Sequence, residues 1–223
     1  MHRIMGMTKV HPNAASFSSS SSGKLKKKTS EVAAEGETTA ATTVLTVWKK
    51  SLLLNCNGFT VIDGKGNLLF RVDNYVSGNR GEVVLMDATG KPLFTFRRKR
   101  LSIGDNWLVY DGETTVNPRF TAKKQVNLLN SKCLAQVIST SPTNKNKLMY
   151  EIEGSYAQRS CAVYDDRRRL VAEIKRKDAV GGASFGNDVF RLVVHPEIDT
   201  SVAMALVILL DQMFASFKSR FSP

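Results

Sequence analysis

The sequence predicts a mostly-β domain of about twelve short strands arranged around one hydrophobic C-terminal helix. Three observations predict this fold. Strand-like runs recur roughly every ten to fifteen residues from Val44 onwards. One hairpin pattern is repeated along the chain, and every residue from Val202 to Leu210 is apolar.

Residues 1–43 precede this domain and are expected to be a disordered tail. Ser, Thr, Ala, Gly, Lys and Glu dominate the segment, and Phe17 is its one aromatic residue. The first 30 residues contain no Asp or Glu and include the run Ser18 to Ser22, a composition that organellar transit peptides share. A tail is the preferred interpretation, and a transit peptide remains the alternative. The basic cluster Lys24 to Lys28 is either solvated or a patch for nuclear import or a membrane surface.

The predicted strands are rich in β-branched and aromatic residues and are separated by Gly, Asn and Asp. They are 44–48, 59–62, 68–72, 82–86, 92–98, 107–110, 119–124, 133–138, 148–152, 161–164, 170–175 and 189–194. Regular short strands in this number predict a sandwich or a barrel in a single domain.

An internal repeat strengthens this prediction. Residues 61–70 and 85–94 each contain an apolar strand, an Asp, a short polar turn and a second apolar strand, and residues 162–171 are a weaker third copy. Gly66 and Gly90 are expected to supply a positive φ in the first two turns. The third copy carries Arg instead, which leaves its turn geometry open.

The C-terminal segment predicts a helix from about Val202 to Phe217, with N-cap candidates in Asp199, Thr200 and Ser201. A helix that is apolar on all faces is either enclosed by protein or spans a membrane. Nine apolar residues extend only about 13 Å, which is far short of a bilayer core. We therefore expect the helix to be enclosed by the β-structure.

Four segments resemble the hallmark segments of LURP-one-related proteins of plants: Leu45 to Leu52, Phe59 to Asp73, Trp107 to Gly112 and Asp199 to Gln212. The resemblance places one domain at 44–217 and a short tail at 218–223. It implies the tubby-like fold, a twelve-stranded β-barrel around a hydrophobic helix that tubby C-terminal domains and phospholipid scramblases share. It also implies a role in plant defence, phosphoinositide binding and membrane-tethered regulation of transcription.

No enzyme, metal site or cofactor is predicted. His195 is the one histidine outside the tail, and it lies at a strand end before Pro196. Gly181 to Gly186 lacks the Lys-Ser/Thr of a phosphate loop. The three cysteines, Cys56, Cys133 and Cys161, are expected to be buried free thiols in a reducing compartment.

The net charge of +12 favours an anionic partner. Residues 44–223 hold 26 Lys/Arg and 17 Asp/Glu, an excess of nine. Four clusters at strand ends or turns are candidate anion- or lipid-binding groups: Arg97, Arg98, Lys99 and Arg100; Lys123 and Lys124; Arg167, Arg168 and Arg169; Lys175, Arg176 and Lys177. The alternative is that they protect strand edges from aggregation.

Three functions are compatible with this pattern. The first is binding to phosphoinositides or another anionic phospholipid surface. The second is an interaction scaffold for unknown protein partners in defence signalling, and the third is a nuclear regulator that contacts DNA. Nucleic acid is the less favoured partner because aromatic residues do not interleave with the basic clusters. We expect a cytoplasmic monomer, located peripherally at the plasma membrane or in the nucleus.

Overall fold

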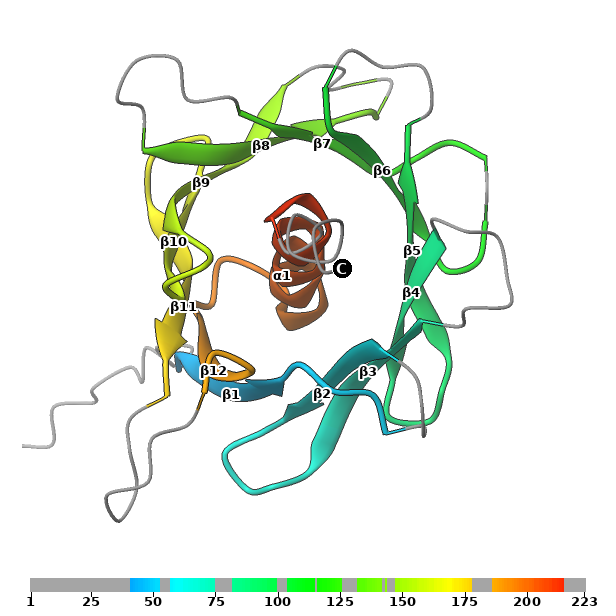
Figure 1. The fold of residues 1–223 in the computed structure, drawn as a ribbon. Coiled ribbons are helices and arrows are strands. Elements are labelled where there is room, and N and C mark those ends of the chain that lie inside the picture. Colours follow the sequence, from blue (N-terminus) through cyan, green and yellow to red (C-terminus); the bar gives the residue numbers. More distant parts are fainter. Residues whose placement is uncertain are drawn as a thin grey trace, which may run out of the picture. The chain divides into compact units, whose positions relative to one another are not determined.

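The strands of the chain form one closed antiparallel barrel. The structure is a computed structural model that describes residues 41–52, 57–74, 82–99, 104–114, 116–125, 132–141, 143, 147–177 and 186–214. Each strand pairs with its neighbours in sequence, and β1 closes the ring by pairing with β12 (Figure 1). The strands are β1 (Thr43–Trp48), β2 (Asn57–Ile62), β3 (Leu68–Asn74), β4 (Glu82–Asp87), β5 (Pro92–Arg98), β6 (Asn106–Asp111), β7 (Phe120–Lys124), β8 (Cys133–Ser139), β9 (Leu148–Ser155), β10 (Ser160–Asp165), β11 (Leu170–Arg176) and β12 (Val189–Val194).

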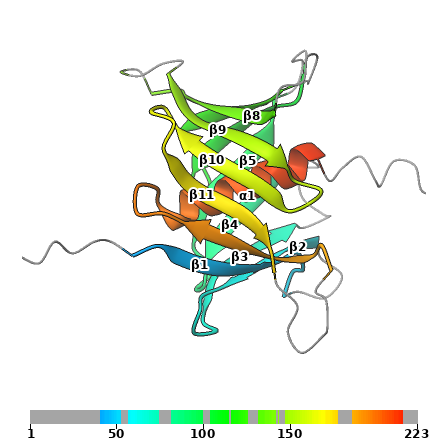
Figure 2. The same cartoon turned by 90° about the vertical axis from the view of Figure 1, so that its left-hand side faces the viewer.

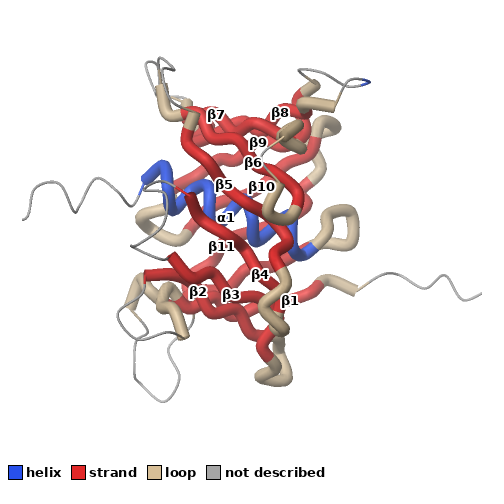
Figure 3. The backbone as a smooth tube through the Cα atoms, turned by 90° about the vertical axis from the view of Figure 1, so that its right-hand side faces the viewer, coloured by secondary structure: helices blue, strands red, loops and turns tan. Residues whose placement is uncertain are grey.

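The helix α1 (Thr200–Phe214) runs through the barrel and forms the centre of its core (Figures 1 and 2). Every residue from Val202 to Asp211 is buried, because the barrel surrounds the helix on all sides. Alternate strand residues such as Phe190, Leu192 and Val194 of β12 point inward against it. Fifteen residues at about 1.5 Å each make α1 about 22 Å long, similar to a strand of six or seven residues. The tube view in Figure 3 shows the same enclosure from the opposite side.

The start of α1 is fixed by a side-chain cap, as predicted. The carboxylate of Asp199 accepts hydrogen bonds from the backbone N–H groups of Ser201 (2.8 Å) and Val202 (3.3 Å). Of the three N-cap candidates, Asp199 therefore caps the helix. The described helix ends at Phe214, and residues 215–217 of the predicted helix lie outside the described part of the chain.

The repeated hairpins are the same structure three times. We call Asp63, Asp87 and Asp165 the turn aspartates. In each, Oδ1 accepts the backbone N–H groups two and four residues later, at 2.8–3.0 Å. Each hairpin also has a register shift just before its aspartate. Gly66 and Gly90 have φ values of 88° and 92°, and Arg168 takes the equivalent left-handed position at 62°.

Candidate basic surface at one end of the barrel

The barrel has two ends that differ in their connections. The exit end, where α1 ends, carries the connections that follow β1, β3, β5, β7, β9 and β11. The entry end, where α1 begins, carries the turns that follow β2, β4, β6, β8 and β10, and the link from β12 to α1. This alternation is a property of any antiparallel barrel whose strands pair in sequence order.

Charge is distributed unequally between these ends. We counted the described residues of each connection with two strand residues on either side, and Asp211 at the end of α1. The exit end holds twelve basic residues, namely Lys49, Lys50, Arg97, Arg98, Lys99, Lys123, Lys124, Lys132, Arg159, Lys175, Arg176 and Lys177. It holds five acidic residues, Asp73, Glu82, Asp105, Asp188 and Asp211, which leaves an excess of seven positive charges. The entry end holds seven basic and eight acidic residues by the same count.

Three of the four basic clusters predicted from the sequence share the exit end. They follow β5, β7 and β11, which are all odd-numbered strands. Arg100 lies outside the described residues. The cluster Arg167 to Arg169 follows β10 and lies at the entry end, so it cannot join the other three in one patch. The alternative of edge protection does not apply to these strands, because a closed barrel has no strand edges.

Several arginines and lysines of the exit end already have structural partners. Arg97 binds both carboxylate oxygens of Glu82 at 3.0 Å, and Arg98 pairs with Asp105. Lys124 donates a hydrogen bond to the backbone oxygen of Met213 at 2.7 Å and so fixes the end of α1. These side chains stabilise the barrel and contribute less to an external ligand.

Other lysines of the exit end are available to solvent. Lys99, Lys123 and Lys132 are exposed and form no ion pair with any described carboxylate. Lys132 was not among the candidates predicted from the sequence, because it stands alone between the strands. The clusters identified there had been selected by runs of adjacent charges, which single lysines do not make.

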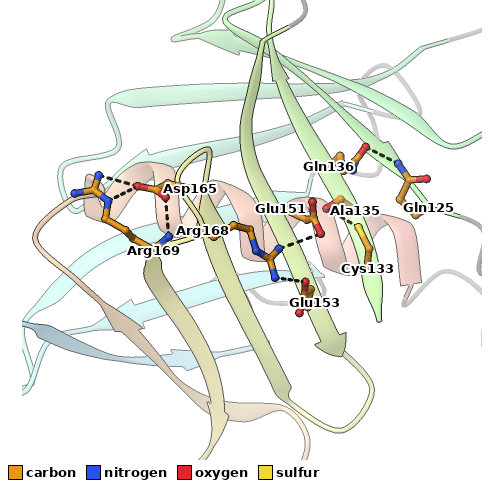
Figure 4. A network of polar contacts seen from close by, with 9 residues as sticks. All are labelled: Gln125, Cys133, Ala135, Gln136, Glu151, Glu153, Asp165, Arg168 and Arg169. Carbon is orange, nitrogen blue, oxygen red and sulfur yellow. Dashed lines mark hydrogen bonds and ion pairs between the residues drawn. The ribbon is translucent and has the colours of Figure 1, made fainter. Parts of the chain in front are cut away.

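The fourth cluster stabilises its own hairpin, as Figure 4 shows. Arg168 donates to Glu151 (3.2 Å) and Glu153 (2.8 Å) of β9, and its guanidinium lies 4.5 Å from the ring centre of Tyr164. Arg169 pairs with the turn aspartate Asp165 at 2.7 Å. These contacts offset the strain of a left-handed arginine, and they explain how an arginine occupies a position that glycine takes in the other two turns.

An exposed aromatic and an exposed aliphatic side chain accompany the basic residues. Trp48, at the end of β1, is 42% exposed, and Leu52 is 52% exposed. The ammonium of Lys50 lies 5.3 Å from the Trp48 ring centre. Sequence reasoning treated Trp48 only as a strand residue. The signal that marks it as a surface residue is its position at the strand end directly before Lys49 and Lys50.

A buried polar cluster links α1 to the barrel at this end. Asp211, which interrupts the apolar run of the helix, is 7% exposed. Its Oδ1 lies 2.8 Å from the ammonium of Lys49 and accepts a hydrogen bond from the hydroxyl of Tyr156 at 3.1 Å. Burial, followed by the charge of Asp211, holds the pKa of Tyr156 well above its usual value, so the phenol stays a hydrogen-bond donor.

A shallow depression lies beside the turn between β9 and β10. It is lined by Gln158, Arg159, Ser160, Lys175 and Arg176. Two of these residues belong to the predicted cluster Lys175 to Lys177, and Arg159 is a basic residue that sequence reasoning missed. The exit end therefore combines exposed lysines, an exposed tryptophan and one basic depression.

Comparison with known proteins identifies the family. A family model described as LURP-one-related matches residues 43–211. Protein LURP-one-related 8 of Arabidopsis thaliana is 52% identical over 214 residues, which cover 94% of this chain and 100% of that protein. The chain belongs to the LURP-one-related family. Protein LURP-one-related 17 of the same plant is 46% identical, and the match covers 78% of this chain and 85% of that protein.

A solved structure shares the fold of this LURP-one-related chain. The X-ray structure of an Arabidopsis thaliana protein aligns with a TM-score of 0.57 at 27% identity, and covers 77% of this chain and 90% of that one. The predicted membership in the family and the predicted barrel with its enclosed helix are thus confirmed. The relation to tubby domains and scramblases stays a prediction.

The remaining sequence candidates in this LURP-one-related chain are packed or lie outside the described residues. His195 is partly buried, with its Nε2 3.9 Å from Glu173. Cys133 and Cys161 are buried free thiols, and Cys56 falls outside the part that the structure describes. Within the described ranges, no group of three His, Cys, Asp or Glu side chains could hold a metal ion. No described helix is long and apolar enough to cross a membrane.

Proposed function

We propose that this LURP-one-related protein is a non-enzymatic module that attaches peripherally to an anionic membrane surface through the exit end of its barrel. The observation that carries the proposal is the excess of seven positive charges at that end, against an excess of one negative charge at the other. A molecule with this polarity is oriented by an anionic surface, with its exit end toward the lipid. The plant-defence role implied by the family resemblance would then be exercised from the membrane.

The exposed side chains at the exit end support a lipid surface over other anionic partners. Tryptophan is enriched at membrane interfaces because its amphipathic ring fits the headgroup level. Trp48 and Leu52 present apolar surface beside Lys49 and Lys50, so insertion and charge attraction act at the same place. An apolar pair of this kind adds nothing to the binding of a phosphodiester backbone by charge alone.

Charge variants at the two ends test this proposal. Replacing Lys99, Lys123 and Lys132 with Gln removes three exposed charges from the exit end, and replacing Lys65, Lys91 and Arg167 with Gln removes three from the entry end. Each basic residue near an anionic leaflet contributes about 1 kcal/mol, so the exit-end variant should bind vesicles of phosphatidylserine and phosphatidylcholine about 100-fold more weakly. The entry-end variant is the matched control and should bind like the unmodified protein.

The depth of insertion has an intrinsic reporter. The chain has two tryptophans, and Trp107 is 4% exposed inside the barrel. A blue shift of emission on adding vesicles, and quenching by brominated lipids, can therefore be assigned to Trp48. The Trp48→Phe variant should lose both signals. Absence of vesicle binding at low salt, or equal weakening by both charge variants, would overturn the proposal and favour a protein or nucleic-acid partner.

A further inference from the structure

The depression beside the β9–β10 turn contains an arginine with an unusual environment. Arg159 is 6% exposed and has a φ of 52°, in the left-handed region that non-glycine residues rarely adopt. Its Nε donates to the backbone oxygen of Asn187 at 2.8 Å. Its guanidinium lies 4.2 Å from the ring centre of Tyr156 and 4.4 Å from that of Phe190. The side chain is therefore held rigidly in place.

No carboxylate among the described residues forms an ion pair with this buried guanidinium. Burying a charge is costly unless it is paired and hydrogen-bonded. The two aromatic faces and the backbone oxygens offset part of this cost. An anion bound in the depression would supply the charge partner that the chain itself does not.

The rim of the depression adds further donors. The Nε of Arg176 donates to the backbone oxygen of Gln158 at 3.0 Å, which draws this side chain across the β9–β10 turn. Its two terminal nitrogens make no ion pair with the described carboxylates. The ammonium of Lys175 pairs with Glu173 at 2.9 Å, so its charge is partly compensated. Ser160 adds a hydroxyl and its backbone polar groups.

We propose that this depression is a binding site for a phosphomonoester, with Arg159 at its base and Arg176, Lys175 and Ser160 around it. Two guanidinium groups suit a phosphate because each presents paired N–H donors to its oxygens. The site deepens the proposed function and rests on it in one respect: a phosphorylated lipid headgroup would be the membrane-bound source of that phosphate. A soluble inositol phosphate carries the same chemistry.

Binding experiments with a soluble probe and with vesicles separate these sources. Inositol 1,4,5-trisphosphate is titrated into the full chain by calorimetry, and amide chemical shifts locate the site. We expect saturable binding with the largest shifts at residues 158–160 and 175–176. Lys175→Gln combined with Arg176→Gln should weaken binding at least tenfold, whereas Lys65→Gln combined with Lys91→Gln should leave it unchanged. Both pairs are exposed, so neither should affect folding.

The outcomes distinguish this site from the general attraction of the exit end. Tighter binding to vesicles with phosphatidylinositol 4,5-bisphosphate than to phosphatidylserine vesicles of equal charge, lost in the Lys175/Arg176 variant, assigns the site to a lipid headgroup. Binding of the soluble probe without this vesicle preference assigns it to a soluble phosphate. Absence of soluble binding together with equal affinity for both vesicles overturns the phosphate site, while the proposed membrane attachment stands.

Discussion

Replacing Leu206 with alanine tests whether α1 is the structural core of the barrel. Leu206 is 1% exposed and lies in the middle of the helix. The substitution removes three carbons, and at about 0.8 kcal/mol per buried methylene the transfer cost alone is about 2.4 kcal/mol. A closed ring of strands cannot collapse onto the vacated space, so a cavity cost is added. We expect the free energy of unfolding to fall by about 3–5 kcal/mol.

Urea denaturation followed by circular dichroism measures this change. A domain of this size should also melt lower by about 2–4 °C per kcal/mol. Val116→Ala is the matched control, because Val116 is 69% exposed and should change stability by less than about 0.5 kcal/mol. A loss below about 1 kcal/mol for Leu206→Ala, with an unchanged denaturant slope, would refute the reasoning that the barrel is built around this helix.

Three further predictions concern the turns and the thiols. Arg168→Ala should be less stable than Arg168→Gly by about 1 kcal/mol in urea denaturation, because both lose the ion pairs but only glycine relieves the left-handed φ. Hydrogen bonds lower the pKa of the turn aspartates, so their contribution to stability is complete above about pH 4, their unfolded-state value, and is lost as the pH falls through the lower folded-state pKa. Urea midpoints between pH 5 and 2 should show this loss. Burial raises the pKa of Cys133 and of Cys161 to about 11, so iodoacetamide should alkylate both slowly at pH 8 until the protein unfolds, as read by mass spectrometry.

The strands were predictable because each carries its own local signal. Every predicted run corresponds to a strand of the barrel, since β-branched and aromatic residues alternate between core and surface. The enclosed helix was predictable for a different reason: a run without a polar face has to be surrounded. The third hairpin turn was left open because its left-handed arginine is stabilised by Glu151 and Glu153 on β9, which no local pattern reveals.

The candidate surface was only half predictable. The basic clusters are visible in the sequence, and counting strands in a sequential antiparallel barrel would already place the cluster after β10 opposite the other three. The ion pairs of Arg97 with Glu82 and of Arg98 with Asp105 depend on the register of β4, β5 and β6. The exposure of Trp48 and the burial of Arg159 likewise depend on three-dimensional packing, and so they were missed.

Asp211 is the residue that joins the end of α1 to the exit end of the barrel, and its removal should have a specific energetic signature. Asp211→Ala leaves the hydroxyl of Tyr156 buried without the acceptor it has now, while Lys49, 31% exposed, can turn to water. An unsatisfied buried donor costs about 1–3 kcal/mol, and the lost ion pair adds to that.

The Tyr156→Phe substitution distinguishes this link from simple packing. If the hydroxyl and the carboxylate depend on each other, the double variant with Asp211→Ala should be more stable than the sum of the single losses predicts, by about 1 kcal/mol in a double-mutant cycle. Asp211→Asn, which keeps an acceptor for Tyr156 but not the ion pair, should lie between Asp211→Ala and the unmodified protein. Additive losses within about 0.3 kcal/mol would show that Asp211 and Tyr156 act independently, and that the end of α1 is held by its apolar contacts alone.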